Sequence, residues 1–203
     1  SVFHAVRVIT DRRFEQMKNP NEHRDWLEYD DGENIPNFDN AKNWNRYWRE
    51  KAKQKEDNRY IDNCYARVLL LSDEFQVIFQ TASQKNLEVI FTDMTQISKL
   101  GRAANVHMFF VSQSMKGTLS ADILNQFSLR FALRCTPDVS QDIMGTPYAA
   151  ENLPKFGGLY VSATGIKKED QPKFSTPNID TDTIHESTKE LAIKAEEENM
   201  PKN

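Results

Sequence analysis

The chain has 203 residues, a formal net charge of −4, and 28% charged and 38% hydrophobic side chains. This length supports a domain with a sizeable core, and no apolar stretch reaches the roughly 18–20 residues of a membrane span. The acidic balance does not single out nucleic acid as a partner. The two cysteines, Cys64 and Cys135, are expected to be free thiols in a reducing, cytoplasmic compartment.

The first part of the chain is predicted to be a helix followed by an acidic loop. Apolar residues recur at helical spacing over residues 2–18, and Asn19-Pro20-Asn21 ends that helix. Residues 22–39 hold seven acidic residues together with Gly32 and Pro36. That composition predicts a solvated loop.

A second helix is predicted over residues 39–55, with Asp39 or Asn40 as its cap. Aromatic and basic side chains are mixed along it, which allows two interpretations. The helix could bind nucleic acid, or its aromatic face could pack on the rest of the domain, which is the interpretation we favour. The side chains concerned are Trp44, Tyr47, Trp48 and Lys51 on one face, with Arg46, Arg49 and Lys53 among them.

Residues 66–74 combine an apolar run with two adjacent carboxylates. The run favours a buried parallel strand, and acids belong at the end of such a strand because burying a carboxylate is costly. This is the Walker B pattern of nucleotide hydrolases, in which Asp73 would hold Mg²⁺ and Glu74 would orient and polarise the attacking water. The alternative is a strand followed by an acidic turn.

Strands and helices alternate after this motif. A helix is predicted over 85–104, followed by an apolar run at 108–111 that leads into Ser112-Gln113-Ser114, and by a third run at 129–135. Strand–helix–strand order with short connections predicts an α/β fold with a mostly parallel sheet. Later elements are predicted as a helix at 138–144, strands at 157–161 and 174–179, and a final helix near 182–198.

Six segments carry a resemblance to a known family. They are Asp-Glu-Phe-Gln at 73–76, Gly-Arg-Ala-Ala-Asn-Val-His at 101–107, Val-Ser-Gln at 111–113, Leu-Arg-Phe-Ala-Leu-Arg-Cys at 129–135, Ala-Ala-Glu-Asn-Leu at 149–153 and Gly-Gly-Leu-Tyr at 157–160. In order and approximate spacing they resemble the FtsK/SpoIIIE/HerA ATPases, with a weaker match at residues 10–14. The resemblance implies a RecA-like core of mostly parallel sheet flanked by helices.

The resemblance also implies a division of the chain. Residues 1–59 would be a helical lead-in with an acidic loop, 60–163 the Walker B-containing core, and 164–203 an edge strand with a C-terminal helix. No Gly-x-x-x-x-Gly-Lys-Ser/Thr motif occurs, and in the family that phosphate-binding loop lies upstream of the helix at 2–18. We therefore expect the chain to be the C-terminal part of the family's domain, inactive alone, with ATP and Mg²⁺ as cofactors of the complete motor.

Further site residues rest on the resemblance. Gln113 would sense the γ-phosphate or the attacking water, or else it caps a strand end. Arg102 would act in trans as an arginine finger on the nucleotide of a neighbouring subunit, or else it is a surface arginine at a helix end. Arg130 is the second candidate for the finger, and Lys116 lies in a loop that helps to line the central pore in the family.

Three functions remain open from the sequence. The first is part of a ring motor, a hexamer in the family, that translocates double-stranded DNA. The second is a type VII secretion ATPase of the EccC/EssC kind, which moves protein substrates. The third is a degenerate ATPase fold that does not hydrolyse ATP and serves for docking or ring building.

Overall fold

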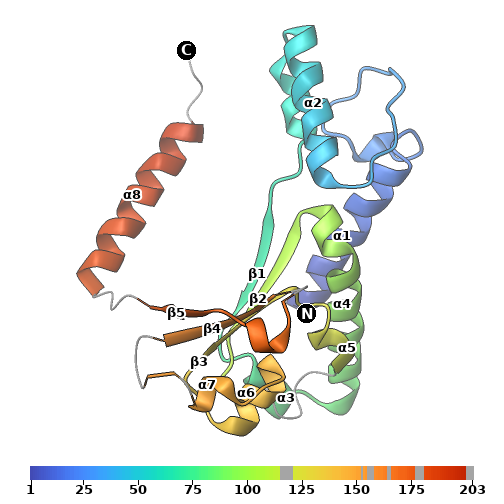
Figure 1. Ribbon diagram of the computed structural model, residues 1–203. Helices are drawn as coiled ribbons and strands as arrows, with labels where there is room; N and C mark the ends of the chain where they lie inside the picture. Colours follow the sequence, from blue (N-terminus) through green and yellow to red (C-terminus); the bar gives the residue numbers. More distant parts are fainter. Residues whose placement is uncertain (115–120, 152, 155–157, 164–165, 177–180, 200–203) are drawn as a thin grey trace. The chain divides into compact units, whose positions relative to one another are not determined.

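The computed structural model describes residues 1–114, 121–151, 153–154, 158–163, 166–176 and 181–199 (Figure 1). The chain divides into two compact units, Ser1–Ser128 and Leu129–Asn203, each with a hydrophobic core of its own. None of the described helices combines the length and the apolar character needed to cross a bilayer. The three-part division expected from the resemblance stays a prediction.

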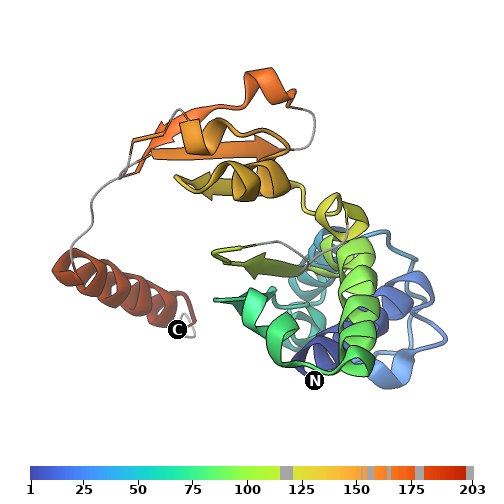
Figure 2. The same cartoon turned by 90° about the horizontal axis from the view of Figure 1, so that it is seen from below.

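The first unit is built on a two-stranded parallel sheet. Strand β1 (Val68–Ser72) pairs with β2 (Val106–Phe110), with Leu70 opposite Met108. Helices α1 (Val2–Lys18) and α4 (Gln84–Ala104) pack against each other and lie side by side in both views (Figures 1 and 2). The other elements of this unit are η1 (Arg24–Trp26), α2 (Ala41–Lys55), η2 (Asn58–Asn63), α3 (Gln76–Thr81) and α5 (Ala121–Leu124).

The three long helices of this unit match the predicted ones closely, and their ends have local causes. The side chain of Asn40 accepts a hydrogen bond from the N–H of Asn43 and caps α2. Ser83 caps α4 in the same way, and α4 ends at Asn105 in a left-handed conformation. One helix, α3, was not predicted.

Within the first unit, the described helices cover only one face of the parallel sheet. Val68 and Leu70 of β1 pack with Val6 of α1 and Ile97 of α4. Side chains alternate along a strand, so Leu69 points to the other face, where it is 61% exposed. The expectation of a strand buried on both faces is therefore wrong. A run of aliphatic residues indicates a strand, but it does not tell which layer covers each face.

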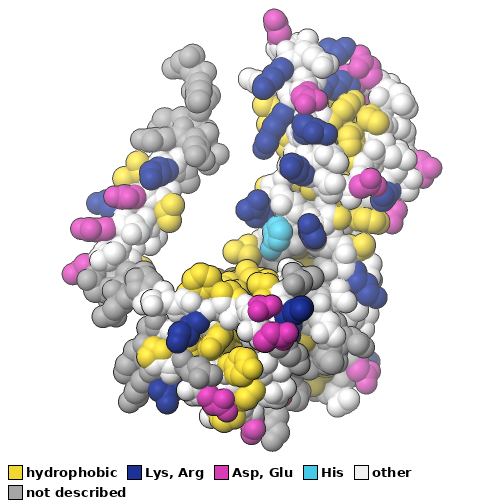
Figure 3. All heavy atoms as spheres, in the orientation of Figure 1, with side chains coloured by type: hydrophobic (Ala, Val, Ile, Leu, Met, Phe, Trp, Pro, Cys, Tyr) yellow, Lys and Arg dark blue, Asp and Glu magenta, His cyan; other side chains and the backbone are white. Residues whose placement is uncertain are grey.

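The aromatic side of α2 forms a second part of the core. Trp44 and Trp48 are 0% and 1% exposed, and the indole N–H of Trp44 donates to the carbonyl of Asn63 at 2.7 Å. The packing interpretation of this helix is confirmed. Basic side chains cover its opposite side and face solvent (Figure 3).

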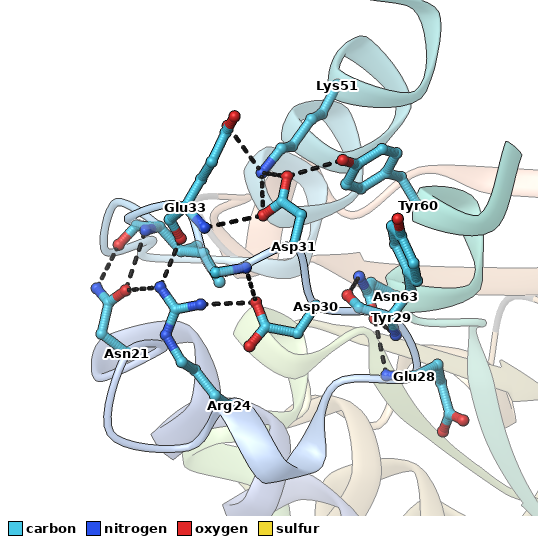
Figure 4. Close-up of polar contacts among 12 residues, drawn as sticks. Asn21, Arg24, Glu28, Tyr29, Asp30, Asp31, Glu33, Lys51, Tyr60 and Asn63 are labelled. Atoms are coloured by element: carbon cyan, nitrogen blue, oxygen red, sulfur yellow. Dashed lines mark hydrogen bonds and ion pairs between the residues drawn. The ribbon is translucent and has the colours of Figure 1, made fainter. Parts of the chain in front are cut away.

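The acidic loop, expected to be solvated, is instead tied to α2 and η2 (Figure 4). Lys51 Nζ lies 2.7 Å from Asp31 Oδ2, and the hydroxyl of Tyr60 donates to the same oxygen at 2.7 Å. Lys55 Nζ lies 2.5 Å from Glu33 Oε1, and Ile35 at the end of the loop is fully buried. These contacts make the loop part of the folded unit.

Burial and hydrogen bonding change the pKa of Asp31 in opposite directions. Partial burial acts to raise the pKa of Asp31, because it disfavours the charged carboxylate. Hydrogen bonds from Lys51 and Tyr60 outweigh this effect and hold that pKa below its ordinary value. The carboxylate is therefore ionised over the whole physiological pH range.

The second unit contains a three-stranded antiparallel sheet in the order β3 (Leu129–Leu133), β4 (Gly158–Ala163) and β5 (Lys173–Ser175). Ala132 of β3 packs with Met144 and Ala149. The expectation that the run at 129–135 extends a parallel sheet is wrong, since β3 pairs antiparallel with β4. The helices of this unit are α6 (Pro137–Met144), α7 (Tyr148–Glu151), η3 (Lys168–Asp170) and α8 (Thr181–Asn199).

Candidate active site

The residues that follow β1 and β2 meet at one edge of the parallel sheet. Asp73 and Glu74 come directly after β1, and Gln113 comes shortly after β2. Because the strands are parallel, both sets of residues lie at the carboxyl edge, where α/β sheets place ligand clefts. The side-chain amide of Gln113 donates a hydrogen bond to Glu74 Oε1. The structure thus brings two of the expected site residues into direct contact.

Two further polar residues complete this cluster. The side-chain amide of Gln76 donates to Glu74 Oε2, so both carboxylate oxygens of Glu74 accept a hydrogen bond. The hydroxyl of Ser112 lies 2.5 Å from Gln76 Oε1 and joins the ends of the two strands. Sequence reasoning assigned no role to Gln76 or Ser112. Both nevertheless stand inside the segments that carry the family resemblance.

Glu74 has an uncommon backbone conformation, with φ of 49°. Two other described non-glycine residues have positive φ, and both of them, Glu56 and Asn105, lie at helix C-termini, where this conformation is common. Glu74 caps no helix. Strain of this kind costs about 1–3 kcal/mol and gathers at functional sites.

The buried side chain of Phe75 holds the strained residue in place. Phe75 is fully buried, and its ring stacks on that of Phe110 with centroids 4.1 Å apart. Its backbone N–H donates to the carbonyl of Val111 at 2.9 Å. These two contacts fix Phe75, the residue next to Glu74, against the end of β2 and the residue that follows it.

Asp73 offers an oxygen suited to a magnesium ion. Its side chain is exposed, and Oδ1 accepts a hydrogen bond from the N–H of Glu74 at 2.9 Å. No described residue donates to Oδ2. Mg²⁺ binds proteins through one or two carboxylates and takes its other ligands from phosphates and water. Among the described residues, no group of three acidic, His or Cys side chains is arranged to hold a metal ion.

The remaining candidates lie outside this cluster. Arg102 is exposed in the last turn of α4, just before the start of β2, and so at the opposite end of that strand from Gln113. Arg130 is half-buried in β3 of the second unit. Lys116 lies outside the described residues, as do Asn152 and Gly157 of the resembling segments.

No protein-family model and no curated protein matches this chain. Solved structures do match, at low sequence identity. The cytoplasmic domain of the Thermomonospora curvata type VII secretion ATPase EccC matches with a TM-score of 0.55 and 19% identity, over 86% of this chain and 18% of that one. The conjugation coupling protein TcpA of pCW3, in its monomer form with ATPγS, matches with a TM-score of 0.52 and 14% identity. The match covers 75% of this chain and 46% of that one.

EssC (ATPases 2 and 3) from Geobacillus thermodenitrificans has a TM-score of 0.49 at 14% identity, over 79% of this chain and 31% of that one. The present chain spans less than half the length of each of these three proteins. The likenesses to EccC and TcpA, at 19% and 14% identity, show that the chain shares the fold of the matched domains. The resemblance found in the sequence motifs and the likeness in structure therefore agree on the class of fold.

Proposed function

We propose that the cluster around Glu74 is the acid-bearing half of an ATP-hydrolysing site. The contact between Glu74 and Gln113 at the carboxyl edge of the parallel sheet carries this proposal. In it, Glu74 orients the attacking water, Gln113 detects the bound nucleotide, and Asp73 holds Mg²⁺. The ion would offset the negative charge that develops on the phosphate oxygens.

The hydrogen bonds of Glu74 describe a resting state of such a site. Both of its carboxylate oxygens accept from amides, those of Gln76 and Gln113. Each carboxylate oxygen can accept a second hydrogen bond, so a water molecule can bind to Glu74 while both amides stay in place. Gln113 follows the neighbouring strand, so in this proposal a shift of its amide toward a bound nucleotide would couple the arrival of substrate to a movement between β1 and β2.

The proposed parent protein is a ring ATPase that moves a polymer. The first of the likenesses, to a secretion ATPase, supports protein as the polymer better than it supports our sequence-based expectation of double-stranded DNA. DNA translocation is the second candidate. It is supported by the likeness to a conjugation coupling protein and by the exposed basic side chains on α2. In either case Arg102 is proposed to reach the nucleotide of a neighbouring subunit in a homo-oligomeric ring.

The test is an ATPase assay on the longest natural protein that contains these 203 residues. Glu74→Gln should lower hydrolysis about 10²- to 10⁴-fold while leaving nucleotide binding in place, because the amide keeps the shape but loses the base. Glu88→Gln, an exposed acid on α4, is the matched control and should retain activity. Normal turnover by Glu74→Gln would contradict the proposal. A parent without any ATPase activity would favour the docking-module hypothesis.

A further inference from the structure

A second path of hydrogen bonds joins Glu74 to the end of β2, besides its direct contact with Gln113. The side-chain amide of Gln76 donates to Glu74 Oε2, and the Ser112 hydroxyl lies 2.5 Å from Gln76 Oε1. Ser112 is the second residue after β2, which ends at Phe110. The carboxylate is therefore held at both oxygens, by Gln113 at Oε1 and by the Gln76–Ser112 pair at Oε2.

The hydroxyl of Ser112 fixes which end of the Gln76 amide faces Glu74. A primary amide has a donor end and an acceptor end, whereas an ionised carboxylate has acceptors only. The NH₂ group of Gln76 must therefore face Glu74, which leaves Oε1 to face Ser112. The single proton of the Ser112 hydroxyl has two acceptors within reach, Gln76 Oε1 at 2.5 Å and the carbonyl of Ser114 at 2.6 Å. With the amide turned this way the proton has to lie toward Gln76, because oxygens this close repel unless a proton lies between them.

The two sides of this cluster differ in exposure. Gln113 is exposed, whereas Gln76 and Ser112 are half-buried. Gln76 is also the first residue of α3 and directly follows Phe75, which is fully buried. Gln113 can therefore turn toward a ligand with little change in packing, while the Gln76–Ser112 pair stays in place. When Gln113 turns away, Glu74 keeps its partner at Oε2.

We infer that Gln76 and Ser112 are positioning residues for Glu74. In the proposed site they touch neither the attacking water nor the nucleotide. Ser112 fixes the amide of Gln76, and that amide holds the carboxylate of Glu74 in one orientation while the sensor glutamine turns to the nucleotide. The inference rests on the proposed function, because the pair acts only through the hydrolytic role of Glu74. Orientation matters because a displacement of about 1 Å from the reactive geometry can lower a rate about 10²-fold.

The test is steady-state ATPase kinetics of the parent protein with Gln76→Met, which keeps the length of the side chain and removes its hydrogen bonds. The change misplaces Glu74 without touching the nucleotide, so kcat should fall about 10- to 100-fold while KM changes less than about twofold. The matched control is Gln80→Met, the same substitution at an exposed position of the same helix, and it should leave both constants unchanged. An unchanged kcat for Gln76→Met would overturn the inference.

Variants of Ser112 separate positioning from general support of the fold. Ser112→Ala should lower kcat nearly as far as Gln76→Met, and the double variant should lose little more than either single one, because both changes interrupt the same path. Ser112→Thr keeps the hydroxyl and should retain most of the activity. Losses that multiply in the double variant, or a threonine variant as slow as the alanine variant, would contradict a common path. If thermal unfolding shows that Gln76→Met is not folded, the two Ser112 variants decide the question.

The Glu74→Gln variant distinguishes a failure of this inference from a failure of the proposed function. If Glu74→Gln loses hydrolysis but Gln76→Met and Ser112→Ala turn over normally, only the inference is wrong. If Glu74→Gln itself turns over normally, the proposed function is wrong and the inference falls with it. In a Glu74→Gln background, Gln76→Met should change the single-turnover rate less than about twofold, because its effect passes through Glu74. A further loss of about tenfold or more in that background would assign Gln76 a different role.

Discussion

Arg7 Nη1 donates a hydrogen bond to Asp93 Oδ1 at 3.0 Å, and this contact joins α1 to α4. Asp93 is 0% exposed, and its second oxygen has no hydrogen-bond partner among the described residues. His4 Nδ1 lies 3.7 Å from that oxygen. The arginine is therefore the main compensation for a carboxylate that is fully removed from water.

We expect Arg7→Ala to destabilise the chain strongly, because it leaves the Asp93 carboxylate buried without its cation. Asp11→Asn, which removes only the half-exposed partner of Arg7, is the matched control. In urea unfolding, the decrease in the free energy of unfolding should be at least about threefold larger for Arg7→Ala than for the control. Equal losses would show that the buried carboxylate is compensated in another way.

Asp31→Asn should cost about 2 kcal/mol at neutral pH, because Lys51 and Tyr60 lose a charged partner. The pKa of Asp31 is lowered in the folded chain. Its contribution to stability is therefore complete above the unfolded carboxyl pKa of about 3.9, and it is lost as the pH falls below this value toward the folded one.

The measurement for Asp31 is chemical unfolding at several pH values between neutral and about 2. The difference in the free energy of unfolding between the unmodified chain and Asp31→Asn should become smaller as the pH falls. Asp39→Asn, which breaks an exposed ion pair with Lys18, should change stability little at any pH. A difference that stays constant down to acid pH would show that the carboxylate charge is not what holds the loop.

Gly101 in α4 is required by the close approach of β2. A Cβ at this position would lie 2.7 Å from the carbonyl oxygen of Val106. Gly101→Ala should therefore shift the backbone and cost about 1–3 kcal/mol, despite the better helix propensity of alanine. Lys99→Ala on the exposed side of the same helix is the control, and thermal unfolding is the measurement. A Gly101→Ala variant as stable as the control would contradict this account.

If Arg102 acts in trans, Arg102→Ala in the complete ring should leave nucleotide affinity intact and reduce ATPase activity about 10³-fold or more. Rings that mix Arg102→Ala with Glu74→Gln subunits should recover some activity. In such rings certain interfaces pair an intact Arg102 with an intact Glu74. Co-assembled rings without any recovery would assign Arg102 a structural role at the end of α4.

The helices were predictable from the sequence because their signals are local. The apolar spacing in α1, α2 and α4 and the cap at Asn40 are set by neighbours a few residues away. The aromatic face of α2 was also interpreted correctly. The spacing of the aromatic residues was enough to predict the buried face of this helix, because every buried residue of α2 lies on the same side.

Strand partners and loop contacts were not predictable in this way. The run at 129–135 has the composition of a strand, but nothing in it indicates that its partner is β4, about 30 residues further on. The contact between Asp31 and Lys51 joins residues 20 positions apart, so an acidic stretch was taken for a solvated loop. In the candidate site, the acidic pair after an apolar run suggested Asp73 and Glu74, and the family resemblance suggested Gln113. Gln76 and Ser112 emerged only from the packing of the two strand ends.

The uncovered face of the parallel sheet has a consequence for how the chain behaves in solution. Leu71 lies beside Phe109 in register, and both are exposed together with Leu69. Neither outer edge of the β1–β2 pair carries a further strand among the described residues. An apolar strand with a free edge is a template for aggregation. We expect the chain to precipitate as its concentration rises and to bind dyes that report on exposed apolar surface, unless this face is shielded.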